Sequence, residues 1–392
     1  MGRGTLGLVT LASMVLAGSS SAQEPWKASY YPYVLKGPND KASLVLHYQY
    51  GQAADYFDRV PFAHSLSIEA GANPDGGRFA LATFKAPRIA EGWRLFAEGG
   101  SVREARYGYF GLGNDTEKTE DPDNEHLNKV RKTRHLFRAD VTRRIVGDLH
   151  IALGGSLTRA NYSVLPGASR FAADCPTLPV VGGPPSTCGD DTDLVGRAAL
   201  VFDSRDREFV TANGVFLEAG GFAGSGGDGY QGVYGIAKGF VSPKEGTVLA
   251  ARMLGRHLDS EAPLDARAVV PAWEHSIPVL GGPESHRSFP YGRFTGLDVV
   301  VMNFEIRQDI LNLGDFGAFT AVGFVDAGRV TEDSEEGPVP QSKDFHVGGG
   351  KDFHVGGGAG LAIRILRSTL LTLNFAWGED GFLYSMGTGW SF

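Results

Sequence analysis

Two cysteines and two of the ten histidines of this 392-residue sequence have positions that invite a test for site chemistry. Cys175 and Cys188 lie in one stretch that is rich in proline and glycine. An exported protein meets an oxidising compartment, so we expect these cysteines to form a disulfide that closes a loop. A zinc site is not expected, because no second Cys or His pair lies nearby at zinc-binding spacing.

The two histidines belong to a repeated octapeptide. Residues 343–350 read KDFHVGGG, and residues 351–358 repeat the same letters. His346 and His354 could be considered as metal ligands, but we interpret the repeat as a local duplication that lengthens a loop or its strand. Two copies are too few for a repeat architecture. An insertion of even length also preserves the facing of a strand. We therefore predict no metal site.

The motifs of common enzyme classes are missing from the sequence. It contains no G-x-x-x-x-G-K-[ST] phosphate loop, no H-E-x-x-H and no G-x-S-x-G. A net charge of -8 and a pI near 5.7 argue against a nucleic-acid partner. We predict neither catalytic residues nor a cofactor. A lipid hydrolase is kept as an alternative, because its Ser–His pair need not form a sequence motif.

Alternating apolar and polar residues run through much of the chain, and this period of two predicts β-strands. In the segment 297–310, Phe304 and Ile306 fall on one face, whereas Glu305 and Arg307 fall on the other. No run of apolar residues after the N-terminus is long enough for a membrane helix. Transmembrane barrels escape that criterion, because their strands alternate.

Two features favour a membrane barrel over a soluble sandwich. The apolar faces carry Trp, Tyr and Phe near strand ends, as interfacial aromatic girdles do. The polar faces carry full charges, such as Arg134, Arg138 and Arg144 on one strand and Arg252 and Arg256 on another. Such faces suit a wet lumen. A soluble two-sheet protein with a solvated outer face is the alternative.

Turn signals divide the chain into an even number of strands, as single-chain bacterial barrels require. Short connections broadly alternate with long ones at 109–130, 163–192, 258–296 and 331–352. We therefore predict an all-β fold, a 16-stranded antiparallel transmembrane β-barrel. The expected strands are 28–35, 42–51, 63–71, 77–86, 92–108, 131–145, 148–162, 193–205, 214–224, 229–241, 246–257, 297–310, 315–330, 353–367, 368–378 and 381–392.

The two ends of the chain carry signals for export and closure. Residues 1–22 combine a positive start, a short apolar run and a small-x-small site, so we predict a signal peptide and an outer-membrane barrel domain from 23 to 392. The last residues include Trp390 and Phe392 in an aromatic-x-aromatic pattern. Barrels of the Gram-negative outer membrane commonly close with such a strand, and we expect these two residues on it.

Five short segments stand in the order of the motifs of one known family. They are 109–114, 202–206 with 213–214, 280–282 with 286–289, 303–307 and 323–328. Through them the chain resembles the outer-membrane assembly-factor superfamily, the BamA and TamA type, also called the bacterial surface antigen family. With the strand pattern around these segments, the resemblance extends over residues 30–392.

The resemblance implies a set of site residues. In this family a loop arginine folds back into the barrel and meets acidic residues on the next two strands. The matching residues here are Arg287, Glu305 and Asp326, and the matching loop motif includes Gly281, Gly282 and Phe289. We hypothesise that charge-assisted bonds among the three tether the sixth outer loop inside the lumen. The alternative is that Arg287 is a solvated loop residue.

The chain also departs from the family pattern. Ser288 stands where the family usually has Gly and His286 where it has Val, so we expect the loop turn to be altered. The predicted first strand begins soon after the predicted cleavage site, so we expect a barrel without periplasmic docking domains.

The family resemblance implies a role in inserting or transporting proteins or lipids at the outer membrane. The expected partners are outer-membrane lipids and a periplasmic or secreted protein client. The implied mechanism is a weak seam between the first and last strands, which perturbs the bilayer or templates incoming strands. An alternative is a passive or secretory pore whose basic lumen favours anions.

Overall fold

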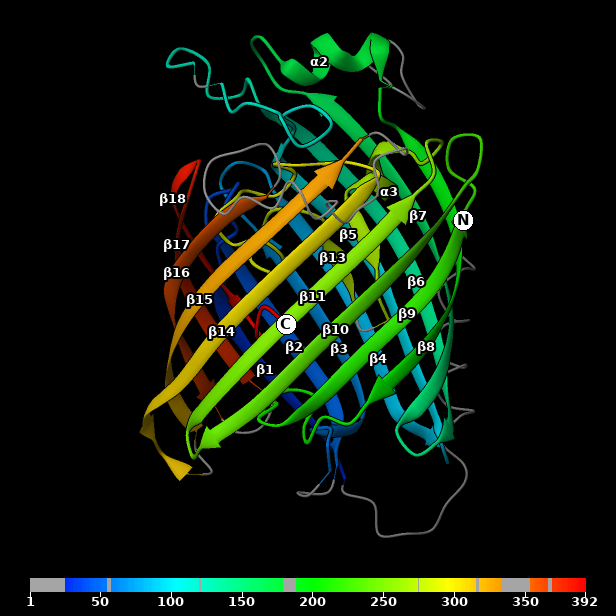
Figure 1. Ribbon diagram of the computed structural model, residues 1–392, viewed down its shortest axis with the longest axis vertical. Helices are drawn as coiled ribbons and strands as arrows, with labels where there is room; N and C mark the ends of the chain where they lie inside the picture. The colour runs from blue at the N-terminus through cyan, green and yellow to red at the C-terminus, as the bar shows by residue number, and fades with distance from the viewer. Residues whose placement is uncertain are drawn as a thin grey trace, which may run out of the picture.

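A single curved sheet makes up most of the chain (Figure 1). The computed structural model describes residues 25–54, 58–119, 121–178, 188–273, 275–314, 317–332, 353–365 and 369–392. In this part of the chain, a 16-stranded antiparallel sheet forms a nearly closed barrel in which neighbours in sequence are neighbours in space, and β11 pairs with β14. The predicted fold class is confirmed.

The strands of the wall match the predicted segments closely, because the alternation that marks them also sets their facing. They are β1 Trp26–Leu35, β2 Ser43–Ala53, β3 Phe62–Ala72, β4 Arg78–Ala90, β5 Trp93–Gly108, β6 Lys129–Val146, β7 Leu149–Val164, β8 Asp191–Asp203, β9 Gly214–Gly224, β10 Tyr230–Lys244, β11 Thr247–Leu258, β14 Asp298–Asn312, β15 Gly317–Thr331, β16 His354–Ile365, β17 Thr369–Gly378 and β18 Gly381–Thr388.

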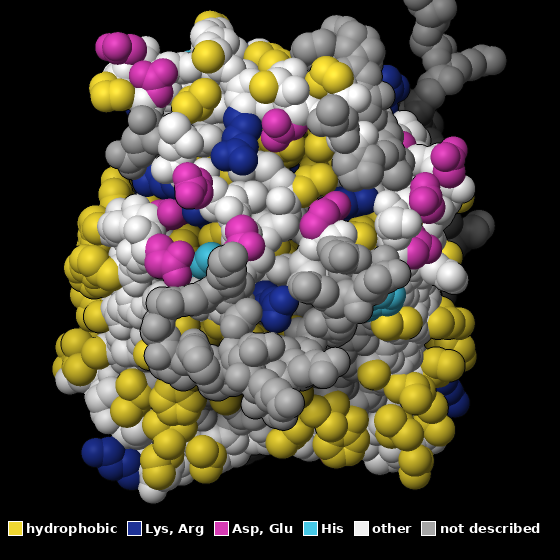
Figure 2. All heavy atoms as spheres, turned by 45° about the horizontal axis from the view of Figure 1, so that its top comes forward, with side chains coloured by type: hydrophobic (Ala, Val, Ile, Leu, Met, Phe, Trp, Pro, Cys, Tyr) yellow, Lys and Arg dark blue, Asp and Glu magenta, His cyan; other side chains and the backbone are white. Residues whose placement is uncertain are grey.

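The wall is apolar outside and charged inside. On β14, Phe304 and Ile306 are 49% and 45% exposed, whereas Glu305 and Arg307 are 1% and 3% exposed. Figure 2 shows hydrophobic side chains gathered on the wall and charged side chains mainly over the loop end. This arrangement suits a barrel seated in lipid and contradicts the two-sheet alternative. Among the described residues, no helix is long and apolar enough to span a bilayer.

Short turns join the strands at one end of the barrel, and long loops lie at the other end (Figure 1). The long loops hold elements that the strand pattern does not predict: α2 Arg170–Asp174, the 3-10 helix Cys175–Thr177, α3 Leu264–Arg267, and a hairpin of β12 Val269–Pro271 and β13 Ser276–Pro278. Cys175 and Cys188 form a disulfide with a Cα–Cα distance of 5.7 Å. This bond joins the helical part of the loop to the segment just before β8.

The end of the chain differs from the prediction. β18 stops at Thr388, and Gly389 follows with a φ of 84°. The last residues then leave the wall for the lumen, where the C-terminus lies (Figure 1). The expectation that Trp390 and Phe392 lie on the closing strand is wrong. The physical reason is that both rings find arginine guanidinium groups inside the barrel, where cation–π contact replaces lipid contact.

Candidate functional site

The connection between β13 and β14, residues 279–297, folds back into the barrel. Two glycines fix its turn: Gly281 has a φ of 139° and Gly282 a φ of 98°. A Cβ on Gly281 would lie 2.1 Å from the carbonyl oxygen of Pro290. Phe289 is fully buried and packs edge-on against Phe294, with ring centroids 5.1 Å apart. The loop motif therefore keeps the turn compact, because the backbone at Gly281 lies against Pro290 and the ring of Phe289 packs on Phe294.

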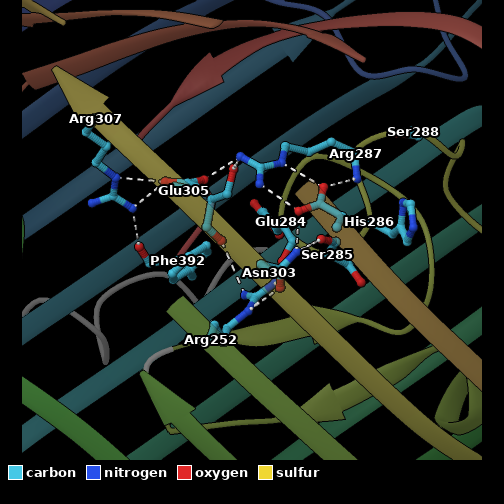
Figure 3. Close-up of polar contacts among 12 residues, drawn as sticks. Arg252, Glu284, Ser285, His286, Arg287, Ser288, Asn303, Glu305, Arg307 and Phe392 are labelled. Atoms are coloured by element: carbon cyan, nitrogen blue, oxygen red, sulfur yellow. Dashed lines mark hydrogen bonds and ion pairs between the residues drawn. The ribbon is translucent and has the colours of Figure 1, made fainter. Parts of the chain in front are cut away.

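Arg287 lies at the tip of this loop and reaches two carboxylates on the wall (Figure 3). Its Nε and Nη2 donate to Oδ2 and Oδ1 of Asp326 at 2.8 and 2.7 Å, and its backbone N–H donates to Oδ2 at 2.9 Å. Its Nη1 donates to Oε1 of Glu305. The guanidinium carbon lies 3.6 Å from the ring centroid of Phe324. The bidentate fork and the stacked ring hold one orientation of the loop.

Three further residues extend these contacts into what we call the lumen cluster: Arg252, Asn303 and Arg307, together with Arg287, Glu305 and Asp326 (Figure 3). The side-chain amide of Asn303 donates to Asp326 at 2.7 Å and accepts from Nε of Arg252 at 2.9 Å. Nε of Arg307 donates to Glu305 at 2.7 Å. β11, β14, β15 and the loop thus meet in one network.

The lumen cluster carries more arginines than carboxylates, and backbone carbonyls meet the excess charge. Arg252 donates to the carbonyl oxygen of Glu284 at 2.8 Å, and Arg307 donates to that of Phe392 at 3.1 Å. Burial disfavours the charge of Arg287, but the carboxylates of Asp326 and Glu305 outweigh this effect and raise the pKa of Arg287 above its usual value. The guanidinium therefore stays charged at any physiological pH.

Ser288 and His286, the two departures from the family pattern, each contact the wall. The Ser288 hydroxyl donates to the carbonyl oxygen of Trp377 on β17 at 2.9 Å. Burial lowers the pKa of His286, and the neutral ring lies with Nε2 3.1 Å from the carbonyl oxygen of His354. A glycine and a valine could make neither contact. These two residues therefore add contacts from the loop to β16 and β17.

A second network holds the β12–β13 hairpin from the wall strands β6, β8 and β9. Arg138 of β6 donates to the carbonyl oxygen of Trp273 at 3.1 Å, and Arg197 of β8 donates to that of Pro271 at 2.5 Å. The carboxylate of Glu218 accepts from the backbone N–H of Trp273 at 2.9 Å. Asp140 pairs with both arginines. The sequence pattern places Arg138 and Arg252 on polar faces. It does not predict that Arg138 binds Trp273 or that Arg252 binds Asn303 and Glu284.

Two other family-like segments hold a loop and a turn at opposite ends of the barrel. In the segment 109–114, the N–H of Gly113 donates to the carbonyl oxygen of Thr295 at 2.8 Å, and Oδ1 of Asn114 accepts from the N–H of Val330 at 3.1 Å. In the turn after β8, Arg205 binds the carboxylate of Asp203 through Nε at 2.9 Å. The first segment brings the β5–β6 loop against the inserted loop, and the second stiffens a turn at the other end.

Among the described residues, no group of His, Cys, Asp and Glu side chains could hold a metal ion, and this includes His354. His354 stacks on Phe294 with a centroid distance of 3.9 Å and pairs with Glu379 at 2.9 Å. His346 and the first octapeptide lie outside the described residues. The second octapeptide supplies the start of β16, where Gly356 leaves room for the side chain of Ser288.

The contact between β1 and β18 is the weakest in the wall. Lys36 and Met386 form an isolated bridge, in which each N–H donates to the other residue's carbonyl oxygen at 2.9 Å. Lys36 immediately follows β1, so this bridge lies at the end of the strand. Every other pair of neighbouring wall strands has an extended ladder of eight or more paired residues, which a register shift interrupts in some pairs. The barrel is therefore closed at this seam by two backbone hydrogen bonds among the described residues.

Comparison with known families places the chain. The model of the Omp85 superfamily domain matches residues 63–390, which is most of the chain. The chain belongs to the Omp85 superfamily. Omp85 barrels are outer-membrane assembly and translocation proteins, and the family predicted from the motifs is confirmed. A search of curated proteins finds no match.

Solved structures share the fold of this Omp85 barrel at low sequence identity. BamA from Haemophilus ducreyi lacking POTRA domains 1–3 matches with a TM-score of 0.56 and 12% identity over 93% of this chain and 70% of that chain. CdiB from Escherichia coli matches with a TM-score of 0.56 and 12% identity over 93% and 63%. CdiB from Acinetobacter baumannii matches with a TM-score of 0.52 and 11% identity over 92% and 59%. The chain thus spans less than two thirds of either CdiB chain.

Gly281→Ala is expected to destabilise the folded barrel by more than about 1 kcal/mol, because a Cβ here meets a carbonyl oxygen at a positive φ. The measurement is the temperature at which the detergent-solubilised barrel loses its folded, heat-modifiable gel mobility. Gly196→Ala is the matched control, because nothing lies within 4 Å of the Cβ position at Gly196. Equal melting temperatures of the two variants would contradict the turn conformation assigned to Gly281.

Proposed function

We propose that this Omp85 barrel inserts client proteins into the outer membrane by opening between β1 and β18. The observation that carries the proposal is the seam, where one bridge joins two strands whose backbones are otherwise unpaired with each other. An opened seam offers rows of free N–H and C=O groups, which can pair with an incoming strand. The freed edge would template the client while the remaining ladders keep the barrel intact.

The filled lumen supports this role over a passive pore. The β12–β13 hairpin and the loop 279–297 lie inside the barrel and are bound to different parts of the wall. Two of the cavities along the lumen have volumes of about 420 and 440 Å³. Because the loop is tethered to β14 and β15, β1 and β18 could separate while the loop still obstructs the lumen. Transport through the lumen would require release of both anchors.

The export route and the partners belong to the same proposal. Residues 1–22 lie outside the described residues, and we propose them as a signal peptide for the barrel domain 23–392. The proposed partners are outer-membrane lipids and a protein client from the periplasm. The chain's own part is strand pairing and bilayer perturbation, and the proposal includes no catalytic step.

Recording of single barrels in a planar bilayer tests this proposal against the pore alternative. We expect the wild-type protein to give small, unsteady currents, because hairpin and loop obstruct the lumen. Arg138→Ala combined with Arg197→Ala removes the two arginine anchors of the hairpin and should raise the mean conductance several-fold. Arg144→Ala is the control, because this exposed arginine lies at the turn end. A large, steady, anion-selective current from the wild-type protein would contradict the proposal.

A further inference from the structure

Three arginines lie together on the outside of the wall, near the loop end. Arg78 begins β4, and Arg103 lies directly opposite it on β5. Arg131 of β6 lies two positions from Thr133, the residue opposite Arg103. Such diagonal neighbours in an antiparallel sheet are about 7–8 Å apart, within reach of long side chains. We call Arg78, Arg103 and Arg131 the arginine trio.

The register shows that the arginine trio faces lipid. Four positions closer to the turn end, Gly99, Phe137 and Leu157 stand opposite one another on β5, β6 and β7. Phe137 is 59% exposed and Leu157 is 49% exposed. Even spacing keeps residues on one face of a strand, so Arg103 and Arg131 share the face of Phe137. At a strand rise of about 3.3 Å per residue, Arg103 lies about 13 Å from the level of Phe137.

No described residue gives the arginine trio a hydrogen-bond or ion-pair partner. The charged neighbours that act on Arg103 are Arg131 and Arg78, which repel it. The Nε atoms of Arg103 and Arg131 are buried and unbonded. Nearby, Arg106 is paired with Asp75 at 3.4 Å and Glu125 at 3.2 Å, so the fold pairs the next arginine along β5. Like charges directly opposite in a sheet are destabilising, and a bound anion would remove the repulsion.

We propose that the arginine trio binds a phosphate group of a lipid headgroup in the leaflet at the loop end. Guanidinium forks match phosphate oxygens, and three converging forks suit a multiply charged phosphate. The trio lies at the polar edge of an apolar band, where a headgroup meets its acyl chains. Acyl chains of the same lipid would then run along Phe137 and Leu157. This site goes beyond the seam and the lumen cluster, and neither depends on it.

Lipid A binding tests the proposal with the full chain folded in detergent. The triple variant Arg78→Gln, Arg103→Gln, Arg131→Gln should bind lipid A at least about tenfold more weakly than wild type in native mass spectrometry. Arg143→Gln is the matched control, because Arg143 lies on the same face of β6 at the turn end and should leave binding unchanged. Folding of every variant is checked by heat-modifiable gel mobility.

Two further probes separate the possible sources of phosphate. Dephosphorylated lipid A should bind the wild-type protein as weakly as lipid A binds the triple variant, and inorganic phosphate should not displace lipid A. If the triple variant fails to fold, Arg103→Gln alone replaces it and should weaken binding several-fold. Wild-type affinity in the folded variant, equal binding of dephosphorylated lipid A, or displacement by inorganic phosphate would each overturn the proposal.

Discussion

Replacing Arg287 with alanine is expected to release the loop 279–297 from the lumen wall. The change leaves the buried carboxylate of Asp326 without its guanidinium partner and Glu305 with Arg307 alone, and such a loss typically costs about 3–5 kcal/mol. In the wild-type barrel Phe294 is buried, so chymotrypsin should not cut after it. In Arg287→Ala, cleavage after Phe294 should become rapid while the wall strands stay protected.

Two matched variants distinguish a lost tether from a general loss of stability. Arg287→Lys keeps the charge but not the bidentate fork, so its loop should be cut at an intermediate rate. Arg144→Ala removes an exposed arginine whose ion pair is long, at 3.9 Å, and the loop should stay protected. If the loop in folded Arg287→Ala resists chymotrypsin as the wild-type loop does, the tether is wrong.

The strands of the barrel wall could be predicted because the alternation of apolar and polar residues lies within each strand's own sequence. On β14, Phe304 and Ile306 alternate with Glu305 and Arg307. This alternation predicts that the segment is a strand, which face each residue occupies, and whether that face meets lipid or the lumen. No long-range information is needed for that reading, since the period of two is local. The same local pattern places Glu305 in the lumen, where the structure brings it to Arg287.

Contacts across the lumen could not be predicted in the same way. Arg138 and Arg197 meet the β12–β13 hairpin only because the wall curves round to it. Periodicity puts a charge on the inner face but does not name its partner on another strand. Trp390 and Phe392 show the same limit, because their spacing suits a lipid-facing strand equally well. What draws them inward is the arginine side chains of β11 and β14.

Locking the seam is expected to abolish insertion of client strands. Lys36 and Met386 exchange both backbone hydrogen bonds, and such pairs have Cα atoms about 5.5 Å apart, within disulfide range. Lys36→Cys with Met386→Cys should therefore form a disulfide on oxidation. Leu373→Cys with Met386→Cys is the matched control, because it links β17 to β18 across a regular ladder and leaves the seam free.

The most direct test measures how fast an added, unfolded eight-stranded barrel protein folds into phosphatidylcholine vesicles that contain this protein. We predict that the reduced seam variant and the oxidised control both accelerate folding as the wild type does. The oxidised seam variant should fall to the rate of empty vesicles, and reductant should restore it. Acceleration that persists with the seam covalently closed would contradict opening between β1 and β18.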